Sequence, residues 1–172
     1  MTVKPILTEP NKLLRQISKP VESVGDDERK LMDDMLDTMY AAPGIGLAAI
    51  QIGVPKRIIV MDISRDEDKK EPRYFVNPVV KNKNQEKATY EEGCLSVPDQ
   101  FAEISRPNTC EVEYLDYNGK KQSLIADGLL ATCIQHEMDH LEGILFIDYL
   151  SKLKKSMIIK KLSKIKSTRI VV

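Results

Sequence analysis

His136 and His140 are the only histidines of the 172-residue chain, and both lie in the heptapeptide IQHEMDH at residues 134–140. In a helix, residues four positions apart share a face and lie about 6 Å apart along the axis, so both imidazoles can bind one metal ion. Glu137, beside His136, could take a proton from a water molecule that the metal activates. This H-E-x-x-H arrangement predicts a catalytic metal site rather than a helix that happens to carry two histidines.

A catalytic metal site needs a third protein ligand, and the sequence excludes the common choices. There is no third histidine, no glutamate follows Glu142, and the position where one protease pattern has its third histidine is Phe146. A cysteine is then the leading candidate. Cys133 would lie about 7.5 Å back along the helix axis from a metal between the histidines, which is too far for a bond of about 2.3 Å, so it is expected to form a wall of the site.

The remaining cysteines differ in their surroundings. Cys110 belongs to the alternating segment CEVEY, which is typical of a strand, and core packing explains it. Cys94 follows Gly93 in the segment EEGCLSVP and precedes a Ser-Val-Pro break. Irregular backbone of this kind can bring a side chain to a metal ion. Cys94 is therefore the candidate for the vacant coordination position.

The segment PGIGLAAIQIG, residues 43–53, has so little side-chain bulk that another backbone could approach it closely. A phosphate-binding loop is excluded, because neither G-x-G-x-x-G nor Gly-Lys-Ser/Thr occurs. A tight turn leading into a strand at Arg57 would explain the same residues. Gln51 has a neutral side-chain amide, which can donate a hydrogen bond to a developing oxyanion without competing for the metal.

The elements that must position these residues predict an α+β fold. Residues 26–42 have a helical apolar stripe that Pro43-Gly44 ends, and residues 57–63 and 73–80 are expected strands. Residues 110–126 alternate around Asn118-Gly119, a strong hairpin signal. Asp127 can cap the metal-binding helix and Gly143 can end it. We expect mixed or antiparallel strands around this central helix, with an N-terminal and a C-terminal helix at either end.

A final helix is expected from Ser151 onward. Its apolar stripe consists of Leu153, Met157, Ile158, Leu162 and Ile165. Eight of the chain's 26 basic residues and none of its 26 acidic residues lie here, which leaves 18 basic against 26 acidic groups in residues 1–150. Such polarised charge suggests a tail with its own partner. We expect one domain over residues 1–172, with 151–172 as a basic helical tail.

The three cysteines and the N-terminal sequence indicate a compartment. Three is an odd number, and MTVKPILTEP contains no apolar segment of the signal-peptide kind. No run of residues approaches the length that crosses a membrane. The sequence therefore predicts a cytoplasmic protein with reduced thiols that is not bound to a membrane.

Three of these stretches coincide with the motifs of one family, and the chain resembles the bacterial peptide deformylases. The shared motifs are G-apolar-G-apolar-A-A-x-Q at residues 44–51, E-G-C-apolar-S at 92–96 and H-E-x-D-H at 136–140. The helical C-terminus resembles that of the type 1 subgroup. One position departs from the pattern, because Phe101 stands where relatives often have arginine, and this concerns substrate contacts at the rim rather than the chemistry.

The resemblance implies a metal-dependent hydrolase that releases formate from N-formylmethionyl chains. Its metal ligands would be Cys94, His136 and His140, with water as the fourth. The native metal would be one Fe²⁺ per chain, which Zn²⁺, Ni²⁺ or Co²⁺ can replace, although binding strength alone favours zinc. Glu137 would carry the proton, and the Gln51 amide and the Leu95 backbone N–H would hold the oxyanion.

The resemblance also implies how the substrate is bound. Its backbone would pair with Ile45, Gly46 and Gly93, as an added β-strand does. The walls of the methionine pocket would be Tyr90, Glu92, Leu129, Thr132 and Cys133.

The implied partners are formylmethionyl peptides and, through the basic C-terminal helix, the ribosome near its exit tunnel, with no specific DNA. Two alternatives stay open at this stage. One is an H-E-x-x-H endopeptidase, and the other is a non-catalytic module that docks on RNA through the basic tail.

Overall fold

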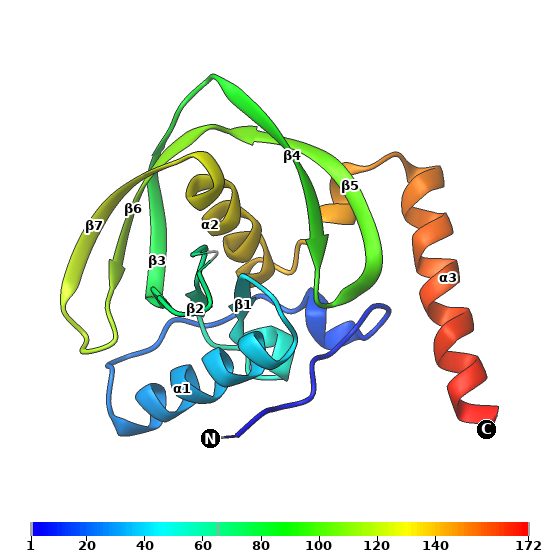
Figure 1. The fold of residues 1–172 in the computed structure, drawn as a ribbon, viewed down its shortest axis with the longest axis horizontal. Helices are drawn as coiled ribbons and strands as arrows, with labels where there is room; N and C mark the ends of the chain where they lie inside the picture. The colour runs from blue at the N-terminus through cyan, green and yellow to red at the C-terminus, as the bar shows by residue number, and fades with distance from the viewer. Residues whose placement is uncertain (1, 65, 172) are drawn as a thin grey trace.

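The computed structural model describes residues 2–64 and 66–171, with side chains described up to residue 164 (Figure 1). Its helices are α1 Asp26–Ala41, α2 Gly128–Leu141 and α3 Lys152–Val171, with short 3-10 helices η1 Lys12–Arg15, η2 Ala49–Ile52 and η3 Phe146–Tyr149. Its strands are β1 Gly46–Ala48, β2 Ile58–Met61, β3 Arg73–Lys83, β4 Lys87–Cys94, β5 Val97–Pro107, β6 Thr109–Leu115 and β7 Lys121–Asp127.

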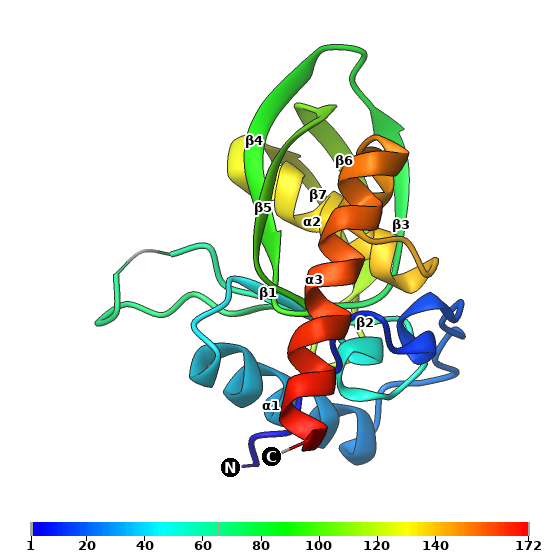
Figure 2. The same cartoon turned by 90° about the vertical axis from the view of Figure 1, so that its right-hand side faces the viewer.

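The strands form two antiparallel sheets in the described part of the chain. Five strands are ordered β1-β2-β3-β6-β7, and β4 pairs with β5 as a separate hairpin. Figures 1 and 2 show α2 enclosed between the larger sheet and the β4–β5 hairpin, with α1 below the sheet and α3 outside the hairpin. The predicted α+β fold, with strands around a central helix and a helix at either end, is confirmed.

Strand β2 explains how the larger sheet separates two layers. All four of its residues are buried, and successive side chains of a strand point to opposite faces. Ile59 packs in the core cluster that contains Phe75 and α2 residues such as Ile134. Ile58 packs in the cluster that contains the α1 methionines. The predicted stripe of α1 is confirmed, since Met32, Met35 and Met39 are buried there and Leu31 and Leu36 pack against them.

Short turn and capping motifs predicted some element boundaries correctly and missed others. The Asn118-Gly119 turn joins β6 to β7, and Gly119 adopts the positive φ of 81° that such a turn requires. Asp127 occupies the N-cap position of α2, but its side chain makes no capping hydrogen bond. The β4–β5 hairpin was not predicted, because its strands contain Gly93, Pro98 and several exposed charged residues, all of which weaken the strand signal.

Helix α3 lies against the hairpin through a third cluster, in which Leu162 is 5% exposed and packs with Val97, Ile104 and Phe146. Two residues of the apolar stripe of α3 are not covered by the body of the molecule, because Leu153 is 72% and Met157 54% exposed. Ile158 packs as expected, and the side chain of Ile165 lies outside the described residues. The helical periodicity of the sequence predicts which residues share a face, but not how many of them β5 covers.

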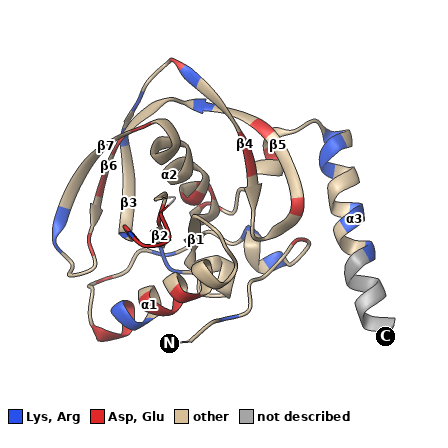
Figure 3. Ribbon diagram, in the orientation of Figure 1, with Lys and Arg blue, Asp and Glu red and all other residues tan. Residues whose placement is uncertain are grey.

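Charge separates α3 from the rest of the molecule. Figure 3 shows Lys and Arg along the described side chains of α3, whereas Asp and Glu gather on α1 and the strands. Among the described residues, no helix is both long and apolar enough to cross a membrane.

Candidate metal centre

The ligand atoms of Cys94, His136 and His140 all lie within 4.8 Å of one another. The Cys94 Sγ and the His140 Nε2 are 3.3 Å apart. Two ligands of one tetrahedral ion are separated by about this distance when the metal–ligand bonds are about 2.0–2.3 Å. The donor set, one sulfur and two imidazole nitrogens, suits a first-row transition metal. These three residues therefore fit a single metal ion.

Two elements that are far apart in sequence bring these ligands together. The two histidines lie one turn apart on α2, with their ring centroids separated by 5.2 Å. Cys94 ends β4, where the register with β5 shifts between Gly93 and Cys94. This irregularity lies at the position where the sequence predicted irregular backbone.

Gln51 links the glycine-rich segment to the cysteine. Its Nε2 donates to the Oγ of Ser96 at 3.0 Å and to the Sγ of Cys94 at 3.5 Å, and its Oε1 accepts from the backbone N–H of Ala48 at 2.9 Å. Gln51 is 1% exposed. Its amide is thus held beside the candidate metal ligands, where the longer hydrogen bond to sulfur leaves a donor that an oxyanion can share. Ser96, a residue that sequence reasoning left without a role, fixes this orientation.

Glu137 lies in the wall of the site and is almost fully buried. Its Oε2 is buried and has no hydrogen-bond partner among the described residues. Burial raises the pKa of the Glu137 carboxyl to about 7, further helped by the negative charge of Glu92 and opposed by His136 and Arg106. A carboxyl with this pKa can both accept and release a proton near neutral pH.

Gly46 explains why the segment before Gln51 is so small. A Cβ at this position would lie 2.7 Å from the Glu137 Oε1 and 3.1 Å from the Cys133 Sγ. Any side chain at residue 46 would therefore displace Glu137. The atoms that approach Gly46 belong to side chains of α2 rather than to another backbone, and Gly46 itself lines the cavity.

Glu92, which the family resemblance placed in the wall of the methionine pocket, uses its carboxylate for another contact. Its Oε1 lies 2.8 Å from the Nδ1 of His136, and Arg106 donates to both of its oxygens, at 2.7 and 3.0 Å. Burial alone would raise the pKa of Glu92, but the hydrogen bonds from His136 and Arg106 outweigh it and lower the pKa. The ionised carboxylate thereby fixes the ring orientation of a candidate metal-ligand histidine.

Arg106 carries this network outward. Its Nη1 donates to the Oδ2 of Asp139 at 2.8 Å, the hydroxyl of Tyr149 donates to the same oxygen at 2.7 Å, and the Tyr149 ring lies 5.0 Å from the guanidinium. Sequence reasoning missed Arg106 and Tyr149 because neither belongs to a motif. Asp139 belongs to the H-E-x-D-H motif, so the sequence did contain a signal for it.

The site residues converge on one cavity of about 460 Å³. His140 is buried in contact with Cys94 and does not line the cavity. All the other residues predicted for the site line it: Ile45, Gly46, Gln51, Tyr90, Glu92, Gly93, Cys94, Leu95, Leu129, Thr132, Cys133, His136 and Glu137. Cys133 is not one of the three clustered ligands, and burial raises the pKa of its thiol well above the ordinary value. Cys110 is 3% exposed in the core, as predicted.

Comparison with known proteins identifies relatives along the whole chain. The family described as Polypeptide deformylase matches residues 3–156. The chain is 90% identical over 172 residues to a peptide deformylase of Pelagibacter ubique, and this covers 100% of both chains. It is 56% identical over 169 residues to a peptide deformylase of Rhizobium meliloti, covering 98% of this chain and 97% of the relative.

Solved structures give the same result. A crystal structure of peptide deformylase from Ehrlichia chaffeensis has a TM-score of 0.93 at 45% identity, and the match covers 98% of this chain and 99% of the other. A second structure of that enzyme, in complex with actinonin, has a TM-score of 0.90 at 48% identity and covers 95% and 98% of the two chains.

Proposed function

Since the chain belongs to the peptide deformylase family, whose members remove the formyl group from the N-terminus of nascent peptides, we propose that this cavity performs that reaction, with Cys94, His136 and His140 as the metal ligands. The chain is a metal-dependent hydrolase that releases formate from N-formylmethionyl polypeptides. The proposal for the ligands rests on one observation above all, the cluster of three ligand atoms within 4.8 Å beside a buried carboxyl group.

We propose one iron(II) ion per chain as the native metal, with zinc, nickel or cobalt able to take its place. The family is metal-dependent, and a sulfur with two imidazole nitrogens accepts each of these ions. When bound, the ion would supply an activated water molecule and positive charge beside the formyl oxygen. We also place the protein in the cytoplasm and treat residues 1–172 as one catalytic domain.

The chain's own residues would manage the proton and the negative charge. Glu137 accepts a proton as water attacks the formyl carbon, and it returns the proton to the amine when the carbon–nitrogen bond breaks. The Gln51 amide and the backbone N–H of Leu95 donate hydrogen bonds to the formyl oxygen while it is negatively charged. The Glu137 Oε2, which has no hydrogen-bond partner in the described part of the chain, and the Gln51 amide beside Cys94 support these roles.

The substrate would be held along the two sides of the cavity. We propose that its backbone contacts Ile45, Gly46 and Gly93, because the small residues there leave the main chain accessible. The methionine side chain would enter between β4 and α2. The walls of that pocket would be Tyr90, Glu92, Leu129, Thr132 and Cys133, all of which line the cavity.

Formate release distinguishes this function from its alternatives. Protein purified without air should contain close to one transition-metal ion per chain, release formate from a formyl-Met-Ala-Ser tripeptide, and leave the unformylated tripeptide intact. Cleavage of the unformylated peptide bond would indicate an endopeptidase. Release of neither product by metal-loaded, folded protein would indicate a binding module.

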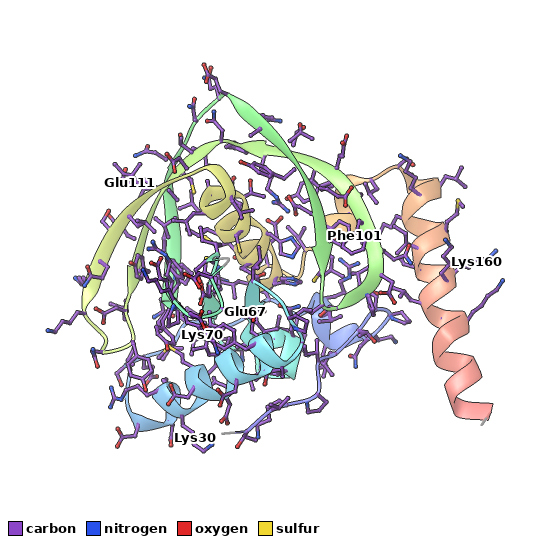
Figure 4. All side chains as sticks on the ribbon, viewed as in Figure 1. Lys30, Glu67, Lys70, Phe101, Glu111 and Lys160 are labelled. Atoms are coloured by element: carbon purple, nitrogen blue, oxygen red, sulfur yellow. The ribbon has the colours of Figure 1, made fainter. Side chains whose placement is uncertain are left out.

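We propose further that α3 docks on the ribosome near the exit of the nascent chain. Lys152 and Lys160 are exposed and form no ion pair with any described residue. Figure 4 shows Lys160 pointing away from the body of the molecule. Lysines that contact phosphates release counterions, which makes binding to RNA depend steeply on salt.

The double variant Lys152→Glu/Lys160→Glu should bind ribosomes more weakly at low salt and hydrolyse the tripeptide normally. The plot of log affinity against log salt should become shallower by about 2 units of slope. Each phosphate contact that is lost reduces the number of counterions released on binding by slightly less than one. Lys155 is left unchanged, since it pairs with Asp148 at 2.7 Å. Deleting α3 would be a poorer test, because it would uncover the cluster around Leu162. Unaltered ribosome binding by the double variant would refute the docking role.

A further inference from the structure

A second hollow, which we call the β5–α3 groove, lies beside the metal cavity. Its volume is about 490 Å³. Strand β5 contributes Phe101, Ala102 and Glu103, and α3 contributes Lys154, Met157 and Lys161. Phe101 lines both the groove and the metal cavity. Figure 4 shows Phe101 on the side of the β4–β5 hairpin where α3 lies.

Phe101 also connects the groove to the backbone that we assign to substrate binding. It is paired with Gly93 across the hairpin, and a Cβ at Gly93 would lie 2.6 Å from the Phe101 ring. The ring therefore covers Gly93 at the edge of the metal cavity. A chain that runs along Gly93 and leaves the cavity past Phe101 enters the β5–α3 groove directly.

The chemistry of the groove favours a peptide with acidic residues. Phe101 is 65% and Met157 54% exposed, which gives the groove two uncovered apolar side chains. Lys154 and Lys161 are exposed and form no ion pair with any described residue, and Glu103 is the single carboxylate of the lining. Two unpaired cations beside exposed apolar surface complement a ligand that carries both carboxylates and apolar groups.

The substrate itself supplies such a ligand. A cavity of about 460 Å³ is the size that holds a drug-sized molecule, so it accommodates the first few residues of a polypeptide and no more. The rest of a nascent chain must leave over the rim. We propose that the β5–α3 groove binds the substrate segment that follows the residues in the metal cavity, with a preference for acidic side chains. This inference rests on the proposed function.

Steady-state formate release from matched peptides tests the proposal. The peptides are formyl-Met-Ala-Ser and two octapeptides that extend it, one with two aspartates and one with two lysines at the same places in the added segment. At low salt, kcat/KM for the wild-type protein should be about fivefold higher for the aspartate octapeptide, the effect of a few exposed charge pairs. The double variant Lys154→Glu/Lys161→Glu should reverse this preference and keep its activity on the tripeptide.

The variant Lys152→Glu/Lys160→Glu is the matched control, since it makes the same charge change on α3 outside the groove. It should retain the preference for aspartate. Equal rates for the two octapeptides, or an equal loss of preference in both double variants, would overturn the groove as a substrate site. Failure of the wild-type protein to deformylate the tripeptide would instead refute the proposed function.

Discussion

Glu137→Gln is expected to lower kcat/KM for formyl-Met peptides by about 10²- to 10⁴-fold, the usual contribution of a positioned acid–base group. Glutamine has nearly the shape of glutamate, so it should fit against Gly46 in the same place, but its amide cannot accept the proton of the attacking water. Glu137 is not one of the three clustered ligands, so the variant should keep its metal. Formate release and elemental analysis of the same preparation separate these two effects.

The control for this variant is Glu142→Gln, just past the end of the same helix. Glu142 is exposed and pairs with Arg57 at 2.7 Å, so losing its charge should hardly change activity. Activity of Glu137→Gln within tenfold of wild type would mean that another group moves the proton. Loss of metal from Glu137→Gln would mean that the carboxylate supports the ligands rather than the chemistry.

The parts of the site that could be predicted from sequence are those that depend on local geometry. The spacing of His136 and His140 places both on one face of any helix, whatever surrounds it. The α1 methionine stripe and the Asn118-Gly119 turn are likewise determined by residues close together in the sequence. Elimination among three cysteines then selected Cys94, the cysteine that lies beside the histidines in the fold.

The parts that could not be predicted depend on pairing between distant segments. The ion pair between Glu92 and Arg106 forms only when β4 and β5 pair as a hairpin. The ion pair between Arg106 and Asp139 forms only when that hairpin packs on α2. A lone arginine in a strand has no periodic signal. The exposed positions of Leu153 and Met157 have a related cause, because the width of the covered face of α3 is set by β5 and η3 rather than by the helix.

Through the hydrogen bonds of Glu92, the β4–β5 hairpin also helps to position the candidate metal ligands. One end of β4 supplies the Cys94 ligand, and two residues earlier Glu92 holds the His136 ring. Two of the three candidate ligands are therefore positioned by the same strand. A change at the end of β4 should therefore affect metal binding in two ways, through the Cys94 ligand itself and through Glu92, which orients His136.

Cys94→Ser is accordingly expected to lose most of its bound metal and nearly all deformylase activity. A serine hydroxyl is not deprotonated as a thiol is, and it is a harder donor than the sulfur that this site offers. The loss should exceed the roughly 10- to 100-fold that removing an outer partner of a metal ligand costs. Metal content per folded chain, measured after purification without air, is the direct test.

Cys110→Ser is the matched comparison, because the same atom is exchanged in the same chain at a residue outside the ligand cluster. Cys110 is 3% exposed among apolar side chains, so a serine there buries a hydroxyl and should lower the free energy of unfolding. It should nevertheless keep the metal and the activity, because Cys110 contributes no atom to the cluster. Thermal unfolding of both variants separates stability from metal binding. If both variants fold and lose metal equally, Cys94 is not the thiol that binds the metal. The role proposed for the end of β4 would then be wrong as well.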